Sequence, residues 1–233
     1  DEVNVINKFV EDGGGLFLVG SNWGDVDGGS DFSYNKIAQS FGVSYANNVV
    51  LVDNQDYILF PYFIKITNIT PNPVTNNVSE FYYVMGTYLE DTGNSTTLAY
   101  SSDNSFADIG YTTPQGTTSS NYQKDSNETN GPYPIIATMN YGKGKVVFMG
   151  AAGTLTNYMV YRDNGWKLGL NSINWLTNNP IPSTYKPAGL ITLNLANLDY
   201  LLITMIAFTV LVFAGLIYQL RRDKKSEGSR SIK

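Results

Sequence analysis

The 233-residue sequence contains neither cysteine nor histidine, and these two absences exclude several kinds of site. Without cysteine the chain forms no disulfide bond, so its stability must come from its core and its surface bonding. Cysteine nucleophiles, Ser–His pairs, and zinc or copper sites built on Cys or His are excluded as well. Acid–base chemistry, if the chain performs any, would therefore have to use carboxylates.

Charged residues are scarce, at 15% of the chain, whereas hydrophobic residues make up 42%. This composition is typical of a folded chain and not of a disordered one. The remaining surface is rich in Tyr, Asn, Ser and Thr, a composition that resembles archaeal cell-surface proteins. The net charge of −5 does not attract nucleic acid, so we expect no nucleic-acid partner.

An uncharged run of 21 residues, 200–220, has the length that a helix needs to cross a bilayer. The next segment, 221–233, carries six Lys or Arg against two acidic residues, and the positive-inside rule places this basic tail in the cytoplasm. A Pro-containing linker, 179–199, precedes the run. The sequence therefore predicts a single-pass protein of the cell membrane, with residues 1–199 outside and the lipid bilayer as a partner.

Helical and strand-like segments alternate at the start of the chain. A helix is predicted over 1–12, and three glycines then end it and lead into a strand over 16–20 that is buried on both faces. A second helix over 34–43 and a strand over 49–52 follow. This alternation predicts an α/β domain over 1–178, with a mostly parallel, flavodoxin-like sheet and helices on both of its faces.

The rest of the domain has a different character. Aromatic-rich strands separated by Pro, Asn, Gly and Ser predict a β-rich insertion over about 57–130. Two strands over 134–150, joined by a tight turn, and an amphipathic helix over 164–178 complete the domain. Helical spacing predicts the residues that each terminal helix buries: Val3, Ile6, Phe9 and Val10 in the first, and Trp166, Leu170, Ile173 and Leu176 in the last.

Four N-x-[ST] sequons lie in the middle of the chain, at Asn68, Asn77, Asn94 and Asn127. All four fall in the loop-rich segment and on the predicted outer side of the membrane, as surface glycosylation requires. Chance matches in an Asn-rich chain are the alternative. We expect N-linked glycans at two or more of these sites.

Two glycine-rich segments each have a functional and a structural interpretation. Asp25, Asp27 and Asp31 alternate along one loop as calcium ligands do, but the distal Glu of an EF-hand is missing, and helix capping is the simpler role. The segment Gly142–Lys145 precedes a strand, whereas a P-loop precedes a helix, so a hairpin turn is favoured. We therefore predict no metal and no cofactor.

The crevice at the carboxyl ends of the strands is the predicted place for any ligand, because open α/β sheets bind ligands there. After the first strand it would be lined by Ser21, Asn22, Trp23 and Asp25, and after a later strand by Ala151–Thr156. Trp23 could stack on a sugar ring or simply pack its loop. A sugar- or peptide-binding module attached to a transporter is the alternative function that this crevice suggests.

Carboxylates for acid–base catalysis are available, but their spacing does not bring any two of them to one cleft. We therefore predict no catalytic residue and no enzymatic activity. The acids considered are Glu80, Glu90, Asp91 and Asp108.

Three segments resemble the glutamine-amidotransferase-like domains that have lost their catalytic residues: Phe9–Gly20, Ile37–Asp53 and Gly142–Gly150. This group includes domains of gliding-motility ABC-transporter accessory proteins, of intraflagellar-transport proteins and of the 48 kDa subunit of oligosaccharyltransferase, which is closest in layout. The resemblance implies a non-catalytic accessory or scaffold subunit of a membrane complex, with integral-membrane subunits as partners. Active amidotransferases place a nucleophile on a strand-to-helix elbow beside a His, and no position here matches either residue.

Members of this group begin with a strand, a helix and a second strand before the helix that opens this chain. A parallel sheet without those strands would expose a long edge. We therefore expect that a preceding segment is missing from the sequence, was cleaved, or is supplied by another chain. A first strand with an open edge is the expected sign, and a closed sheet would contradict it.

Overall fold

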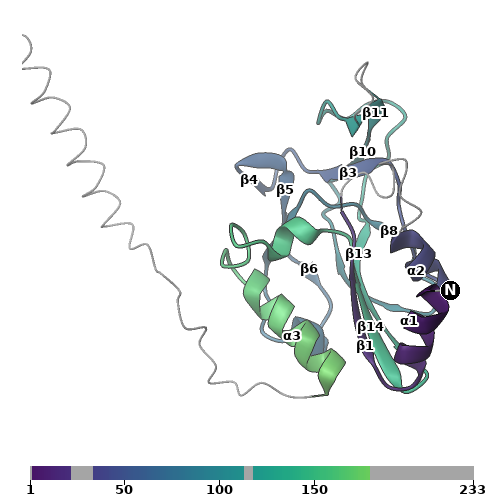
Figure 1. The fold of residues 1–233 in the computed structure, drawn as a ribbon. Helices are drawn as coiled ribbons and strands as arrows, with labels where there is room; N and C mark the ends of the chain where they lie inside the picture. The colour runs from purple at the N-terminus through teal and green to yellow at the C-terminus, as the bar shows by residue number, and fades with distance from the viewer. Residues whose placement is uncertain (1, 22–33, 113–117, 179–233) are drawn as a thin grey trace, which may run out of the picture. The chain divides into compact units, whose positions relative to one another are not determined.

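A computed structural model describes residues 2–21, 34–112 and 118–178 of the protein (Figure 1). They belong to one compact unit, Asp1–Tyr185. The helices are α1 (Glu2–Glu11), α2 (Tyr34–Ser40) and α3 (Gly165–Thr177), with short 3-10 turns η1 (Pro73–Thr75) and η2 (Ala152–Leu155). The strands are β1 (Gly15–Val19), β2 (Ser44–Tyr45), β3 (Val49–Val52), β4 (Tyr57–Ile58), β5 (Phe60–Ile66), β6 (Asn68–Ile69), β7 (Phe81–Val84), β8 (Leu89–Asp91), β9 (Thr96–Tyr100), β10 (Phe106–Ile109), β11 (Tyr111–Thr112), β12 (Thr118–Ser119), β13 (Pro134–Tyr141) and β14 (Gly144–Met149).

The central sheet has five strands in the order β1-β14-β13-β9-β6 and is mostly antiparallel. Only β1 and β14 run parallel in it, with Gly15 opposite Lys145. The prediction of a mostly parallel sheet was therefore wrong for the described residues. The predicted tight turn, Gly142 and Lys143, joins β13 directly to β14, and a connection this short permits only antiparallel neighbours. The insertion then supplies β9 and β6, which also pair antiparallel.

Helices cover both faces of this sheet, as predicted (Figure 1). The alternation of side chains along β1 and β14 divides the core between the two faces. Leu18, Val146 and Phe148 pack with residues of α1 and α2 in one buried cluster. The intervening Val147 and Met149 pack with Leu168 and Leu176 of α3 in the other. Because both faces are covered, β14 is almost entirely buried.

The predicted strand Val49–Val52 forms, but it lies outside the central sheet. Its partner is β10, antiparallel to it, with Leu51 opposite Ala107. The neighbouring sheet β4-β5-β7 is antiparallel as well. The described residues of the predicted insertion thus form strands β4 to β12. Two of these strands, β9 and β10, pair with β13 and β3.

The faces that the terminal helices bury differ in part from the predicted ones. Val10 is fully buried, but Phe9 is 58% exposed. In α3 the buried side chains include Leu168 and Leu176, whereas Ile173 is 51% exposed. The helical periodicity therefore predicted that Phe9 and Ile173 are buried, whereas the described residues leave both of them about half exposed.

β1 has a strand neighbour on one side only among the described residues, and its outer edge is open. Its burial reflects this position: Gly15 is exposed and Phe17 and Val19 are half-buried. The prediction of a strand buried on both faces was therefore only partly right.

No helix within the described ranges is both long and apolar enough to cross a membrane. The predicted linker, membrane-spanning run and basic tail, 179–233, lie outside these ranges.

Candidate functional site

In the part that the structure describes, the carboxyl ends of β1 and β14, where the crevice was predicted, lie side by side. Backbone hydrogen bonds join the two strand ends: Gly20 N–H donates to Met149 O at 2.7 Å, and Ala152 N–H donates to Gly20 O at 2.9 Å. Of the predicted lining residues, Ser21 and Ala151–Thr156 are described; Ser21 is exposed, whereas Ala151 and Thr154 are buried. Asn22, Trp23 and Asp25 lie outside the described residues, as do Asp27 and Asp31.

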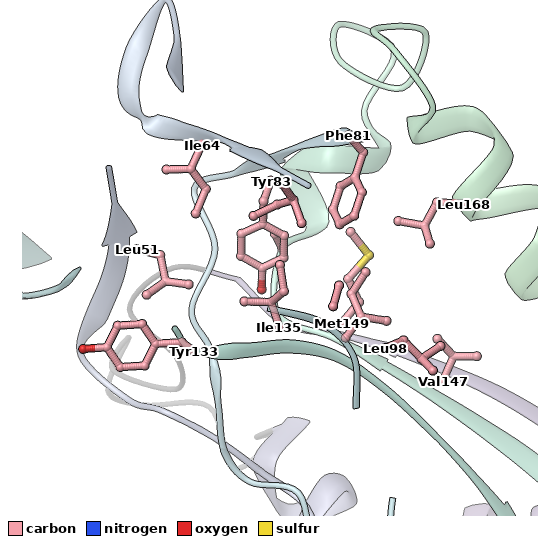
Figure 2. Close-up of a cluster of buried hydrophobic side chains, with 14 of the residues drawn as sticks. Leu51, Ile64, Phe81, Tyr83, Leu98, Tyr133, Ile135, Val147, Met149 and Leu168 are labelled. Carbon is pink, nitrogen blue, oxygen red and sulfur yellow. The ribbon is translucent and has the colours of Figure 1, made fainter. Parts of the chain in front are cut away.

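Two buried tyrosines, Tyr45 and Tyr83, pack against the carboxyl ends of β1 and β14. Tyr45 donates from its hydroxyl to Leu18 O at 2.7 Å, and Tyr83 donates to Thr87 O at 2.5 Å. In Figure 2 the Tyr83 ring lies between β7 and the central sheet, close to Ile135 and Met149. A Cβ on Gly150 would overlap the Tyr83 hydroxyl oxygen and the Thr87 carbonyl oxygen, so no side chain fits between them.

Burial raises the pKa of both phenols well above the usual value for tyrosine. Each phenol therefore keeps its proton and its bond to a backbone carbonyl. Neither group can serve as a general base, because it would have to ionise in the apolar core. Within the described residues, the strand ends therefore form a packed region of the core.

The four acids considered for catalysis are not brought together. Glu80 pairs with Lys65 at 2.8 Å, and Glu90 and Asp91 are exposed on β8. Asp108 is buried on β10, and the charges that act on it are those of Glu128 and Asp125. No cluster of three or more acidic residues within the described ranges is placed to hold a metal ion.

Asp108 and Glu128 form a buried pair that the sequence did not reveal. Glu128 accepts from Ile109 N–H at 2.7 Å and from Asp125 N–H at 2.9 Å. Burial raises the pKa of Asp108, the Glu128 charge raises it further, and hydrogen bonds from Ser120 and the Tyr122 amide oppose these effects. One oxygen of Asp108, Oδ2, is buried without a hydrogen-bond partner. Both carboxylates hold loop backbone in place, which is a structural role.

Replacement of Asp108 by Asn is expected to stabilise the domain at pH 7 by about 1 kcal/mol, because it removes a buried charge with an unpaired oxygen. A carboxyl whose pKa is raised by folding contributes stability at low pH and loses it as pH rises through the folded pKa. The gain should therefore shrink as pH falls toward the ordinary Asp pKa of about 4. Urea unfolding at pH 7 and pH 4 measures it, with the exposed Asp103→Asn as the control. Equal gains at both pH values would contradict the assignment.

The four sequon asparagines are all exposed. Asn68 lies on the edge strand β6, and Asn77 follows η1 with a left-handed φ of 55°. Asn94 lies within a turn that Ser95 N–H closes by donating to Thr92 O at 2.9 Å. Asn127 differs from the others, since the hydroxyl of its sequon, Thr129, is hydrogen-bonded to the Tyr133 hydroxyl at 2.7 Å. The folded domain therefore presents three sequons more openly than the fourth.

An exposed apolar surface lies where β4 turns into β5 and where β7 ends; we call it the β4–β5 tip. Its members are Tyr57, Leu59, Phe60 and Met85, which are 38–52% exposed. Phe60 stacks on Tyr62 with ring centroids 5.3 Å apart. Met85 lies beside Tyr62, since its N–H donates to Tyr62 O at 2.9 Å.

The backbone of the β4–β5 tip is strained at two of these positions. Leu59 has φ of 64° and Met85 has φ of 50°, a left-handed conformation that costs a non-glycine residue roughly 1–2 kcal/mol. Strain of this kind concentrates at functional sites. The sequence signal was the density of aromatic residues over 57–63, but it indicated only strands, and the exposure of their side chains could not be predicted.

Comparisons with known proteins support the fold. No protein family and no curated protein matches the sequence. Among solved structures, the protein is similar to the "mmIFT52 N-terminal domain", with a TM-score of 0.57 and 16% identity over 79% of this chain and 73% of that one. A second similar structure is "Cytoplasmic Protein STM1381 from Salmonella typhimurium LT2", with a TM-score of 0.43 and 17% identity. It covers 77% of this chain and 59% of that one, so the likeness spans less than two thirds of its length.

Proposed function

We propose that this protein is a non-catalytic accessory or scaffold subunit of a membrane complex, anchored by one membrane-spanning helix over 200–220. Its folded domain would bind the outer parts of integral-membrane partner subunits. The observation that carries the proposal is the β4–β5 tip, where four large apolar side chains are exposed near one turn and two of them, Leu59 and Met85, lie on strained backbone. Exposed apolar groups gathered in one patch mark interaction surfaces, whereas single exposed apolar residues are ordinary.

The β4–β5 tip has the composition of an interface core. Aromatic residues and methionine are enriched at such cores, and charged residues are depleted. Tyr57, Phe60 and Met85 are of these kinds. The phenyl–phenol stack of Phe60 and Tyr62 is pre-formed, so little side-chain entropy remains to be lost on binding.

The packed strand ends support the non-catalytic part of the proposal. Tyr45 and Tyr83 occupy the region where a domain of this class would bind a substrate, and both hold their protons. Likeness in fold to the mmIFT52 N-terminal domain is compatible with a degenerate amidotransferase-like domain of the kind that the sequence resembles. We extend the proposal to an oligosaccharyltransferase-type complex on that resemblance alone.

The glycoprotein part of the proposal rests on exposure. The asparagines of all four sequons are open to solvent, and N-linked glycans at Asn68, Asn77 and Asn94 would extend from the domain without disturbing its core. The mass of the protein purified from its native membrane, before and after enzymatic deglycosylation, tests this part. No loss of mass would overturn it.

Substitution of the β4–β5 tip is expected to release the partner. The full chain, tagged at its C-terminus, is purified in mild detergent and its co-purifying proteins are identified by mass. Leu59→Ser together with Phe60→Ser should reduce an integral-membrane partner by about tenfold or more, because an apolar anchor of an interface contributes at least 1–2 kcal/mol.

The matched control is Tyr161→Ser, a residue of similar exposure, 49%, in the segment that precedes α3. It should leave the partner in place. A wild-type chain that is a monodisperse monomer in mild detergent would contradict the proposed function. If the double variant recovered as much partner as the wild-type chain, the β4–β5 tip would not be the partner-binding surface.

A further inference from the structure

Among the described residues, β1 has an open edge, which lies at the floor of an uncharged, largely apolar groove between two helices. Gly20 N–H donates to Met149 O, and Lys145 N–H donates to Gly14 O. The backbone N–H and C=O groups of the even-numbered residues of β1 therefore point toward β14. In a parallel pair the alternate residues direct their backbone groups the other way. The N–H and C=O groups of Gly15, Phe17 and Val19 therefore point out of the sheet edge.

The groove has a volume of about 510 Å³. Phe9 of α1 lines one side, Ile173 and Leu176 of α3 line the other, and Gly15 and Phe17 of β1 lie between them. The described residues that line it are all uncharged, and the polar ones are Thr177 and Asn178 at the end of α3. Lys8, the residue before Phe9 on α1, forms an ion pair with Asp12 at 2.6 Å.

The side chains on the two sides of the groove, Phe9 and Ile173, are those whose exposure differs from the burial that helical periodicity predicted. Phe9 and Ile173 both belong to the apolar face predicted for their helices, yet they are 58% and 51% exposed. They are far apart in the sequence but line the same groove. A single additional strand beside β1 would cover both of them, and each helix would then bury the face that its sequence predicts.

We propose that the β1 edge binds an extended, uncharged, apolar segment of a partner polypeptide, which adds to the central sheet as a sixth strand. This deepens the proposed function and rests on it, because it states how a partner would be held. Backbone pairing with Gly15, Phe17 and Val19 supplies the affinity, as in other cases of strand addition. Helices flank both faces, so consecutive side chains of the added strand are buried, and four to five successive apolar residues are the matching chemistry.

Charge and geometry both favour this occupant. An uncharged groove gives no partner to a charged side chain, whose desolvation would then go uncompensated. A helix could cover Phe9 and Ile173, but its backbone is paired internally and would leave the outward groups of β1 without partners. An extended backbone satisfies those groups and covers the flanking side chains together.

Binding of a model strand tests the inference. The full chain in mild detergent is titrated into a fluorescein-labelled peptide, acetyl-Lys-Gly-Val-Ile-Val-Val-Gly-Lys-amide, and anisotropy is followed. We expect saturable binding that Ile173→Lys weakens by about tenfold or more, since it places a charge on an apolar flank. The same peptide with N-methyl groups on alternate amides should not bind, because it cannot donate to β1.

Hydrogen exchange provides a readout that side-chain docking alone would not change. The amide protons of Phe17 and Val19 should exchange quickly in the free protein and become protected when the peptide binds. Those of Leu16 and Leu18, which face β14, should already be protected. Phe17→Pro removes one outward donor without removing a bond to β14, and it should weaken peptide binding while the protein stays folded by circular dichroism.

Phe60→Lys separates this inference from the proposed function. It alters the β4–β5 tip and should leave peptide binding and the β1 protection pattern unchanged.

Absence of saturable binding to folded wild-type protein overturns the inference. Self-association that Ile173→Lys abolishes, without peptide binding, also overturns it, because the occupant would then be a second copy. Loss of the co-purified partner with the tip variant but normal peptide binding would leave both proposals standing.

Discussion

Truncation of Tyr83 to Ala is expected to lower the free energy of unfolding by about 4 kcal/mol, within the range for removal of a large buried aromatic side chain. The ring is fully buried among Ile135, Met149 and their neighbours, and its hydroxyl donates to Thr87 O (Figure 2). Removal of the ring leaves a cavity at the strand ends and an unpaired buried carbonyl. Urea unfolding of the folded domain, with far-UV circular dichroism as the signal, measures the loss.

Tyr83→Phe is the matched control because it keeps the ring and removes only the hydroxyl. It should cost about 1 kcal/mol, the net value of one buried hydrogen bond. The difference between the two variants isolates the packing contribution of the ring. A loss of about 1 kcal/mol or less for Tyr83→Ala would mean that the strand ends are not packed around this side chain. The crevice would then again be a candidate for ligand binding.

The sequence predicted local structure well because local signals determine it. The glycines after α1, the turn at Gly142 and Lys143, and the strand Val49–Val52 all lie where the sequence placed them. Each depends on the conformations of a few neighbouring residues, such as the positive φ that Gly13 and Gly142 adopt. Helices on both faces were also predictable, because two amphipathic segments flank the strands.

Strand pairing could not be predicted in the same way. The run Val49–Val52 is buried at every position whether it pairs parallel in a central sheet or antiparallel with β10, so its apolar pattern is the same in both cases. The insertion supplies competing strands, and nothing in the pattern of any single strand selects its partner. The long-range pairing of β9 with β13 is therefore a property of the assembled fold.

The candidate sites show a similar division between local pattern and assembled structure. Sequons are local motifs, and their exposure follows from loop position. By contrast, Tyr45 and Tyr83 had no distinctive sequence context, although they pack beside the ends of β1 and β14. The exposure of Phe9 and Ile173 conflicts with their helical periodicity, and this conflict is what points to an occupant at the β1 edge.

Gly144→Ala is expected to destabilise the domain by about 3 kcal/mol, at the upper end of the cost of overpacking. A Cβ at this position would overlap the carbonyl oxygens of Val10 and Gly14, which are backbone atoms and cannot rotate away. These two oxygens belong to the end of α1 and the turn into β1. The new methyl group would therefore push the first helix and its glycine turn away from the β13–β14 hairpin.

The control for Gly144→Ala is Gly42→Ala, which tests backbone conformation without crowding. Gly42 has φ of 76°, and a Cβ at this position would have no atom within 4 Å. Ala should therefore lower the free energy of unfolding only by the left-handed strain, about 1 kcal/mol. The two variants separate the two reasons for a glycine, close approach and positive φ. Thermal unfolding of both proteins measures them. If Gly144→Ala cost no more than Gly42→Ala, the contact between the α1 end and the hairpin would not constrain this fold. The glycines that follow α1 would then be needed only to end the helix.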